Sequence, residues 1–174
     1  MKRIAALLFA IAVPATALAD PSSDTAKAEM AKIAQMAGKW KGGGWIDRPE
    51  GRSYSVSAET IEMRLDGHAI LIEGFHTDPR SGVVNHHALA IIAWDDAQRQ
   101  YRFMSALAAG RTGYFPARLE GRKFIWSIPI PNGPTTRFTI SLDDPDKWNE
   151  VGEQSRDGGV TWVKFFEMNL ERVK

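Results

Sequence analysis

The amino-acid sequence predicts an all-β protein: an antiparallel up-and-down barrel of about ten strands with one short N-terminal helix. Beyond residue 40, short runs rich in apolar residues follow one another and are separated by turn-forming residues. No helical pattern lies between these runs, which excludes parallel strands joined by helical crossovers. A meander of this length has two exposed edges unless it closes, so we expect a barrel. An open, strongly bent sheet packed on the helix is the alternative.

Residues 25–37 have the spacing of an amphipathic helix. Its apolar face would carry Met30, Ile33, Ala34 and Ala37. Ser23 or Asp24 can cap the start, and Gly38 stands where such a helix would end. The preceding residues 20–24 are polar and are expected to form a flexible lead. We therefore expect a single domain over residues 25–174.

Ten segments after the helix are expected as strands, each joined to the next by a short turn. Asp66-Gly67 is a two-residue turn signal, and residues 78–82 and 157–159 mark two further turns. The expected strands are residues 40–47, 53–65, 68–77, 84–94, 101–107, 111–117, 123–128, 135–142, 147–155 and 161–172.

Turn lengths set the register of residues 53–107, and register decides which side chains share a face. The first turn gives the pairs Leu65–His68, Met63–Ile70, Ile61–Ile72 and Glu59–Gly74. A loop over residues 78–82 gives Thr77–Val83, Gly74–His86, Ile72–Ala88 and Ile70–Ala90, and the next turn gives Trp94–Tyr101, Ile92–Phe103 and Ala90–Ser105. One face is then almost wholly apolar and is taken as the interior: Leu65, Met63, Ile61, Ile70, Ile72, Ala88, Ala90, Ile92, Trp94, Tyr101 and Phe103.

Polar residues gather at one end of this interior face, namely Ser57, Glu59, His76 and His86. An apolar lining that meets a few placed polar groups is typical of a small-molecule pocket, so Glu59, His76 and His86 are candidate ligand contacts. The same residues could form a two-His, one-carboxylate metal site or an acid–base pair. They could also be rim residues hydrogen-bonded to one another or to water. His87 points to the opposite face from His86 and cannot join it.

Trp94, Tyr101 and Phe103 are further candidate ligand contacts, because the register turns them inward. Trp94 and Tyr101 lie at the opposite end from the histidines, which argues against one small ligand that touches both groups. Gly42-Gly43-Gly44 is interpreted as a bend or a close packing site rather than a phosphate loop. The sequence contains no G-x-S-x-G or H-E-x-x-H motif, so we assign no catalytic residue, no metal ligand and no cofactor.

The first nineteen residues have the pattern of a cleavable signal peptide. Lys2 and Arg3 precede the apolar run 4–13, which is too short to span a bilayer, and cleavage is expected after Ala19. A membrane anchor is the alternative. No later stretch is long and apolar enough to span a bilayer, so we expect a periplasmic or secreted protein that is not integral to a membrane.

Composition narrows the function classes further. Removal of Lys2 and Arg3 from the 22 basic residues leaves 20 against 21 acidic ones, so nothing suggests a nucleic-acid binder. The chain has no Cys, which excludes disulfides, thiol chemistry and cysteine-based zinc sites. Stability must therefore come from the hydrophobic core.

Gly38-Lys39-Trp40, after a short helix and at the head of the first strand, resembles the G-x-W opening of the lipocalins and the wider calycin group. The run that ends at Trp94-Asp95 and the 157–162 hairpin resemble a lipocalin-like family of secreted bacterial proteins of unknown function. The resemblance covers residues 36–172. It implies that Trp40 packs at the closed barrel end, with Arg172 in the place of the partner arginine from the last strand.

The sequence thus favours a secreted lipocalin-like protein that binds a small apolar or amphipathic molecule. Two alternatives stay open: a small periplasmic enzyme that uses Glu59 and interior His residues, and a structural or interaction domain with a filled core. The oligomeric state is not predicted.

Overall fold

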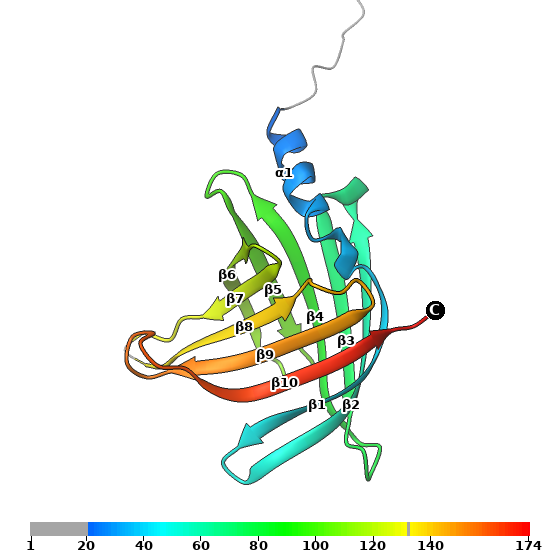
Figure 1. Ribbon diagram of the computed structural model, residues 1–174, viewed down its shortest axis with the longest axis vertical. Coiled ribbons are helices and arrows are strands. Elements are labelled where there is room, and N and C mark those ends of the chain that lie inside the picture. The colour runs from blue at the N-terminus through cyan, green and yellow to red at the C-terminus, as the bar shows by residue number, and fades with distance from the viewer. Residues whose placement is uncertain (1–20, 132) are drawn as a thin grey trace, which may run out of the picture.

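Ten antiparallel strands close into a barrel in a computed structural model of the protein, which describes residues 21–131 and 133–174 (Figure 1). The strands are β1 (Gly38–Arg48), β2 (Gly51–Arg64), β3 (Ala69–Thr77), β4 (Val84–Asp95), β5 (Gln100–Leu107), β6 (Thr112–Glu120), β7 (Lys123–Ile128), β8 (Thr135–Ser141), β9 (Lys147–Ser155) and β10 (Val163–Arg172). Each strand pairs with its sequence neighbours, and β1 pairs with β10, so the sheet has no open edge. The predicted closed meander is confirmed and the open sheet is excluded.

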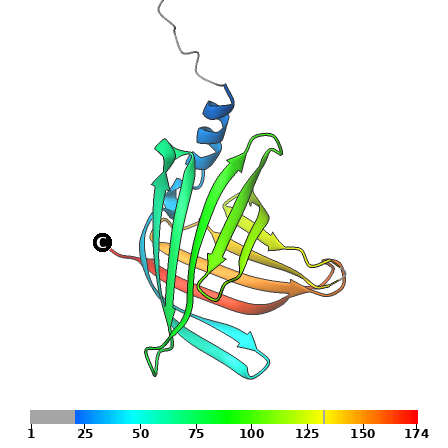
Figure 2. The same ribbon diagram turned by 180° about the vertical axis from the view of Figure 1, so that it is seen from behind.

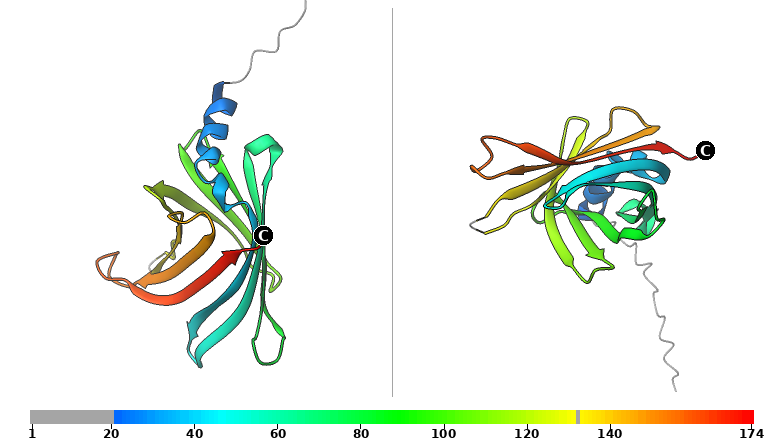
Figure 3. Two further views of the ribbon diagram at one scale, coloured as in Figure 1. Left: turned by 45° about the vertical axis from the view of Figure 1, so that its right-hand side comes forward. Right: turned by 90° about the horizontal axis from the view of Figure 1, so that it is seen from below.

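A helix, α1 (Pro21–Ala31), lies at one end of the barrel, away from the tip of the β1–β2 hairpin (Figures 2 and 3). It begins four residues earlier than predicted and takes in residues 21–24, which we had expected as a flexible lead. It also ends earlier, because the chain tightens into a 3₁₀ turn over Ala34–Met36. This turn brings Met36 into the core with Met30 and Ile33, whereas Ala34 and Ala37 are only partly buried.

The proposed signal peptide and its cleavage after Ala19 lie outside the described residues. Within residues 21–131 and 133–174, no helix is long and apolar enough to cross a membrane.

The predicted register between β2 and β3 is confirmed. Ile61 pairs with Ile72 and Glu59 with Gly74, and Asp66 and Gly67 form the turn between the strands. The amide of His68 donates to the carbonyl of Leu65 at 3.1 Å across this turn. Leu65 itself was predicted to face inward, which is wrong. Its backbone takes a positive φ of 51° and its side chain is 74% exposed.

The predicted register between β3 and β4 is wrong by two residues. His86 pairs with His76 instead of Gly74, and Ala90 pairs with Ile72. One residue of the shift comes from a tighter loop, in which the Asp78 amide bonds the Val83 carbonyl, and one comes from an irregularity beside Thr77. An even shift leaves every side chain on its predicted face, because the side-chain period of a strand is two.

The predicted interior face forms most of the core on this side of the barrel. Seven of its members are buried, namely Ile61, Ile70, Ile72, Ala90, Ile92, Tyr101 and Phe103. The register between β4 and β5 is as predicted, with Trp94 opposite Tyr101 and Ile92 opposite Phe103. The fold therefore places the polar cluster of β2–β4 on the inside of the barrel.

The glycine triplet in β1 lets two backbones approach closely. A Cβ on Gly42 would come within 2.2 Å of the Asn169 carbonyl oxygen, and one on Gly44 within 2.7 Å of the Glu167 carbonyl oxygen. Both contacts are too short for any side chain. The triplet is thus a packing site at the seam where β1 meets β10, which agrees with the sequence interpretation.

Trp40 and Arg172 are in contact near the α1 end of the barrel. The Arg172 guanidinium lies 4.1 Å from the centre of the Trp40 ring and donates to the carbonyls of Ala37 and Gln35. The indole of Trp40 donates to the Met36 carbonyl at 2.9 Å. These bonds fasten the 3₁₀ turn to the first and last strands, the arrangement implied by the G-x-W resemblance.

Candidate functional site

The barrel encloses a cavity of about 470 Å³ on the side away from α1. Its walls are largely aromatic and aliphatic, and the aromatic members include Phe103, Phe115, Trp126, Phe138, Trp148 and Phe166. The Trp126 ring is stacked between Phe103 at 4.3 Å and Phe138 at 4.2 Å. The stack is a flat apolar wall that spans β5, β7 and β8.

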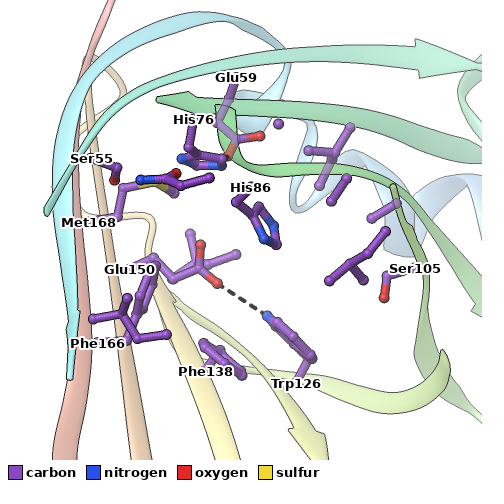
Figure 4. A pocket seen from close by; sticks show the side chains of 18 of the residues that line it. Ser55, Glu59, His76, His86, Ser105, Trp126, Phe138, Glu150, Phe166 and Met168 are labelled. Carbon is purple, nitrogen blue, oxygen red and sulfur yellow. Dashed lines mark hydrogen bonds and ion pairs between the residues drawn. The ribbon is translucent and has the colours of Figure 1, made fainter. Parts of the chain in front are cut away.

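The polar cluster predicted on β2–β4 forms a connected chain of side chains, and Figure 4 shows its members Ser55, Glu59 and His76 close to His86. His76 shares a hydrogen bond with the Ser57 hydroxyl through Nδ1 at 2.7 Å, and its Nε2 lies 3.3 Å from a Glu59 carboxylate oxygen. The Ser57 hydroxyl in turn bonds the Ser55 hydroxyl at 3.0 Å. Ser57, Glu59 and His76 are all buried. The structure therefore brings together Glu59 and His76, two of the three polar residues expected in a pocket.

The third predicted residue, His86, lies beside His76 on the cavity wall, with the two rings 5.1 Å apart. The ring surface of His86 is open to the cavity, but the barrel around it still withdraws it from bulk solvent. This burial, followed by the proximity of His76 and Arg111, lowers the pKa of His86 to about 4. His86 is therefore neutral at neutral pH, so one of its ring nitrogens donates a hydrogen bond and the other accepts one.

Gly74 makes room for the Glu59 carboxylate. A Cβ on Gly74 would lie 2.8 Å and 2.9 Å from the two carboxylate oxygens. Glu59 faces Gly74 across the β2–β3 ladder, so the absent side chain is what allows the carboxylate to lie flat against β3.

Sequence reasoning missed Glu150, a second buried carboxyl on the cavity wall. The Trp126 indole N–H donates to its Oε1 at 3.3 Å. Burial, followed by the negative charge of Glu59, raises the pKa of Glu150 to about 7. The signal was present in the strand period: Trp148 is two residues earlier, so any register that buries Trp148 also turns Glu150 inward.

Two buried side-chain polar atoms in the described part of the chain have no hydrogen-bond partner, Oε2 of Glu59 and Nε1 of Trp148. Both residues line the cavity. Because buried polar groups are normally paired, this unmet capacity marks the cavity wall as the place where a bound molecule would find partners.

Phe103 lines the cavity as predicted, but Trp94 and Tyr101 do not. Tyr101 is buried under α1, where its hydroxyl donates to the Glu29 carbonyl at 2.8 Å, and the Trp94 ring packs edge-on against it. Their inward direction was right, but the α1 end of the interior is filled by packing. Tyr101 fastens the helix to the barrel, and neither residue lines the cavity.

The two arginines of the described cavity lining lie at its outer part: Arg48 ends β1, and Arg111 precedes β6. Both are exposed. In residues 21–131 and 133–174, no group of three His, Asp or Glu residues is arranged to hold a metal ion. The inner lining thus combines apolar walls with Glu59, Glu150 and the two histidines.

The protein is a closed ten-stranded antiparallel barrel with a Trp–Arg contact at one end and a cavity at the other, a fold similar to that of calycin-like barrels. No protein-family model matches the sequence, and no curated protein matches it. Solved structures match the fold. Rv2717c from M. tuberculosis superimposes with a TM-score of 0.62 at 10% identity, over 89% of this chain and 99% of that one. The S-type phycobiliprotein lyase CPES from Guillardia theta gives a TM-score of 0.55 at 11% identity, over 88% and 96%.

Proposed function

We propose that this protein binds a small amphipathic molecule inside the barrel. The observation that carries the proposal is the cavity of about 470 Å³, which has apolar walls and a few polar groups placed together. This volume and composition are typical of small-molecule sites. The unpaired polar atoms of Glu59 and Trp148 on the same wall support a bound molecule rather than a filled core.

The Guillardia theta protein of similar fold is named a phycobiliprotein lyase. A lyase of that name acts on another molecule, which agrees with a barrel of this fold that binds a ligand. At 11% identity it supports the fold and does not identify a ligand.

A pair of tryptophan substitutions tests the proposal. Ser105→Trp places an indole in the cavity, whereas Ala106→Trp places the same group on the outer surface of the same strand. The probe is the fluorescent molecule N-phenylnaphthylamine. We expect the probe to bind the wild type and Ala106→Trp equally well. It should bind Ser105→Trp at least about tenfold more weakly, because the introduced indole fills the cavity space that the probe would occupy. Equal binding to both variants, with both folded, would place the site outside the barrel.

A second candidate function is proton-transfer catalysis, which the chain from Ser57 through His76 to Glu59 favours. A His held between a hydroxyl and a carboxylate is an arrangement that general acid–base chemistry uses. If a reaction is found, His76→Ala and Glu59→Gln should each abolish turnover. Unchanged turnover in both variants would remove these residues from the mechanism.

We also propose that the chain is exported and cleaved after Ala19, which rests on the N-terminal sequence pattern alone. N-terminal sequencing of the protein isolated from its host's periplasmic or culture fraction tests this. The expected first residue is Asp20, and an uncleaved Met1 in the cytoplasmic fraction would contradict it.

A further inference from the structure

Among the described residues that line the inner part of the cavity, there are two glutamates and two histidines but no Lys or Arg. Glu59 projects from β2 and Glu150 from β9, and Figure 4 shows both carboxyl groups facing the space beside His76 and His86. Arg48 and Arg111, the two cationic residues of the lining, belong to the exposed rim. A ligand that enters head first therefore meets a negative inner end behind a positive rim.

Glu59 has unmet capacity for a hydrogen-bond donor. One carboxylate oxygen lies near His76, and the other is buried with no partner. The side chain is only 8% exposed, so bulk water does not replace the missing donor. An ionised carboxylate can only accept hydrogen bonds, and a buried acceptor without a donor is costly. The ligand that fits Glu59 must therefore offer an N–H or O–H group.

Glu150 adds a second acceptor on the other side of the same space. The Trp126 indole donates to it at 3.3 Å, and the Trp148 indole lies close enough to act on the same carboxyl. A positive charge placed between two carboxylates offsets the electrostatic repulsion between them. A neutral hydroxyl could satisfy one lone pair but would leave this repulsion in place.

The walls next to these acids suit an organic cation. Trp126 and Trp148 both line the cavity, and Trp126 presents part of the stacked aromatic wall. An ammonium group is attracted to the electron-rich face of an indole, and the attraction grows when water is excluded. The apolar remainder of the cavity accepts a hydrocarbon body.

We infer that the ligand is an amphipathic amine, with its ammonium group held between Glu59 and Glu150 and its apolar body against the Phe103–Trp126–Phe138 wall. The inference deepens the proposed function and rests on it. Glu59 supplies the unpaired acceptor, Glu150 supplies the second negative charge, and Gly74 leaves the space in which the Glu59 carboxylate lies.

Amine binding should strengthen as the pH rises through about 7, where Glu150 loses its proton. The other charged or titratable groups that line the cavity are Glu59 from β2, His76 from β3 and His86 from β4, with the exposed Arg48, Tyr54 and Arg111 at the rim. His86 stays neutral over this range, because its pKa is about 4. Glu150→Gln should remove the change in amine affinity near pH 7, and this separates the effect of Glu150 from that of the other groups.

The experiment compares three probes with one hydrocarbon body and different head groups: decylamine, decanol and decanoate. Calorimetric titration of the purified protein at about pH 8 measures their dissociation constants, with Glu59→Gln and Glu150→Gln as test variants. Glu62→Gln is the matched control, because Glu62 lies on the same strand with its side chain on the exposed outer face. Melting temperatures of all variants establish that they are folded.

We expect the wild type and Glu62→Gln to bind decylamine at least about tenfold more tightly than decanol or decanoate. Glu59→Gln should lose most of this preference while its affinity for decanol stays within about twofold. Equal binding of the three probes, or a preference that survives in both Glu59→Gln and Glu150→Gln, would overturn the amine assignment and leave the cavity-binding proposal standing. Binding of none of the probes would overturn both.

Discussion

At the scale of single residues, the buried carboxyl of Glu150 sets the clearest test. Its pKa of about 7, against an ordinary value of 4.5, means that the folded protein holds this proton more tightly than the unfolded chain does. Folding stability from this group is therefore fully present below about pH 4.5 and is lost as the pH rises to about 7. The shift corresponds to about 3 kcal/mol.

Glu150→Gln should remove that dependence, because the amide does not ionise. Relative to the wild type, the variant should gain up to about 3 kcal/mol between about pH 4 and about pH 8, as measured by urea unfolding. A difference between the two proteins that does not change with pH would show that Glu150 is not buried as described.

Arg172 makes the second test at this scale. Its guanidinium lies on the Trp40 ring, donates to three backbone carbonyls and lies 3.2 Å from Asp146. Arg172→Ala should lower the free energy of unfolding by about 2 kcal/mol, because carbonyls of the 3₁₀ turn lose their donors. Arg172→Lys should recover less than half of the loss, since one ammonium cannot replace the planar fork.

At the scale of elements, the β3–β4 register can be checked with engineered cysteines, because the chain has none of its own. Glu73 lies directly opposite Leu89 on the outer face of the barrel, whereas the register expected from the sequence would place it opposite His87. The pair Glu73→Cys with Leu89→Cys should oxidise to a disulfide. The pair Glu73→Cys with His87→Cys should keep two titratable thiols, since diagonal Cβ atoms are too far apart. The opposite outcome would restore the expected register.

Strand periodicity predicted most elements and their inward faces, but it could not predict local irregularities. The Asp66-Gly67 turn was correct because those residues favour positive φ, yet the same turn also draws Leu65 out of the interior. The bulge beside Thr77 has no sequence marker, so His86 was paired with the wrong residue. Glu59 and His76 were found because their strands share a well-defined turn. Glu150 was missed because its strand was never placed in register with the others.

At the scale of the whole molecule, the two ends of the barrel differ: one is packed with side chains and the other holds the cavity. The α1 end is filled by Met30, Ile33 and Met36 and is tied to the first and last strands through Trp40 and Arg172. The other end holds the cavity, with acids inside and arginines at the rim. The filled end supplies buried apolar packing in a chain that has no disulfides, while the other end of the barrel stays hollow.

The most direct test of this account is an NMR titration of the tryptophan indole N–H signals with N-phenylnaphthylamine. The Trp126 indole bonds Glu150 in the cavity, whereas that of Trp162 bonds the Gly159 carbonyl in the β9–β10 turn. That of Trp40 bonds the Met36 carbonyl at the filled end. We expect a saturable shift of the Trp126 signal and little change at Trp40 and Trp162. An unmoved Trp126 signal, or an equal shift at Trp162, would contradict binding inside the barrel.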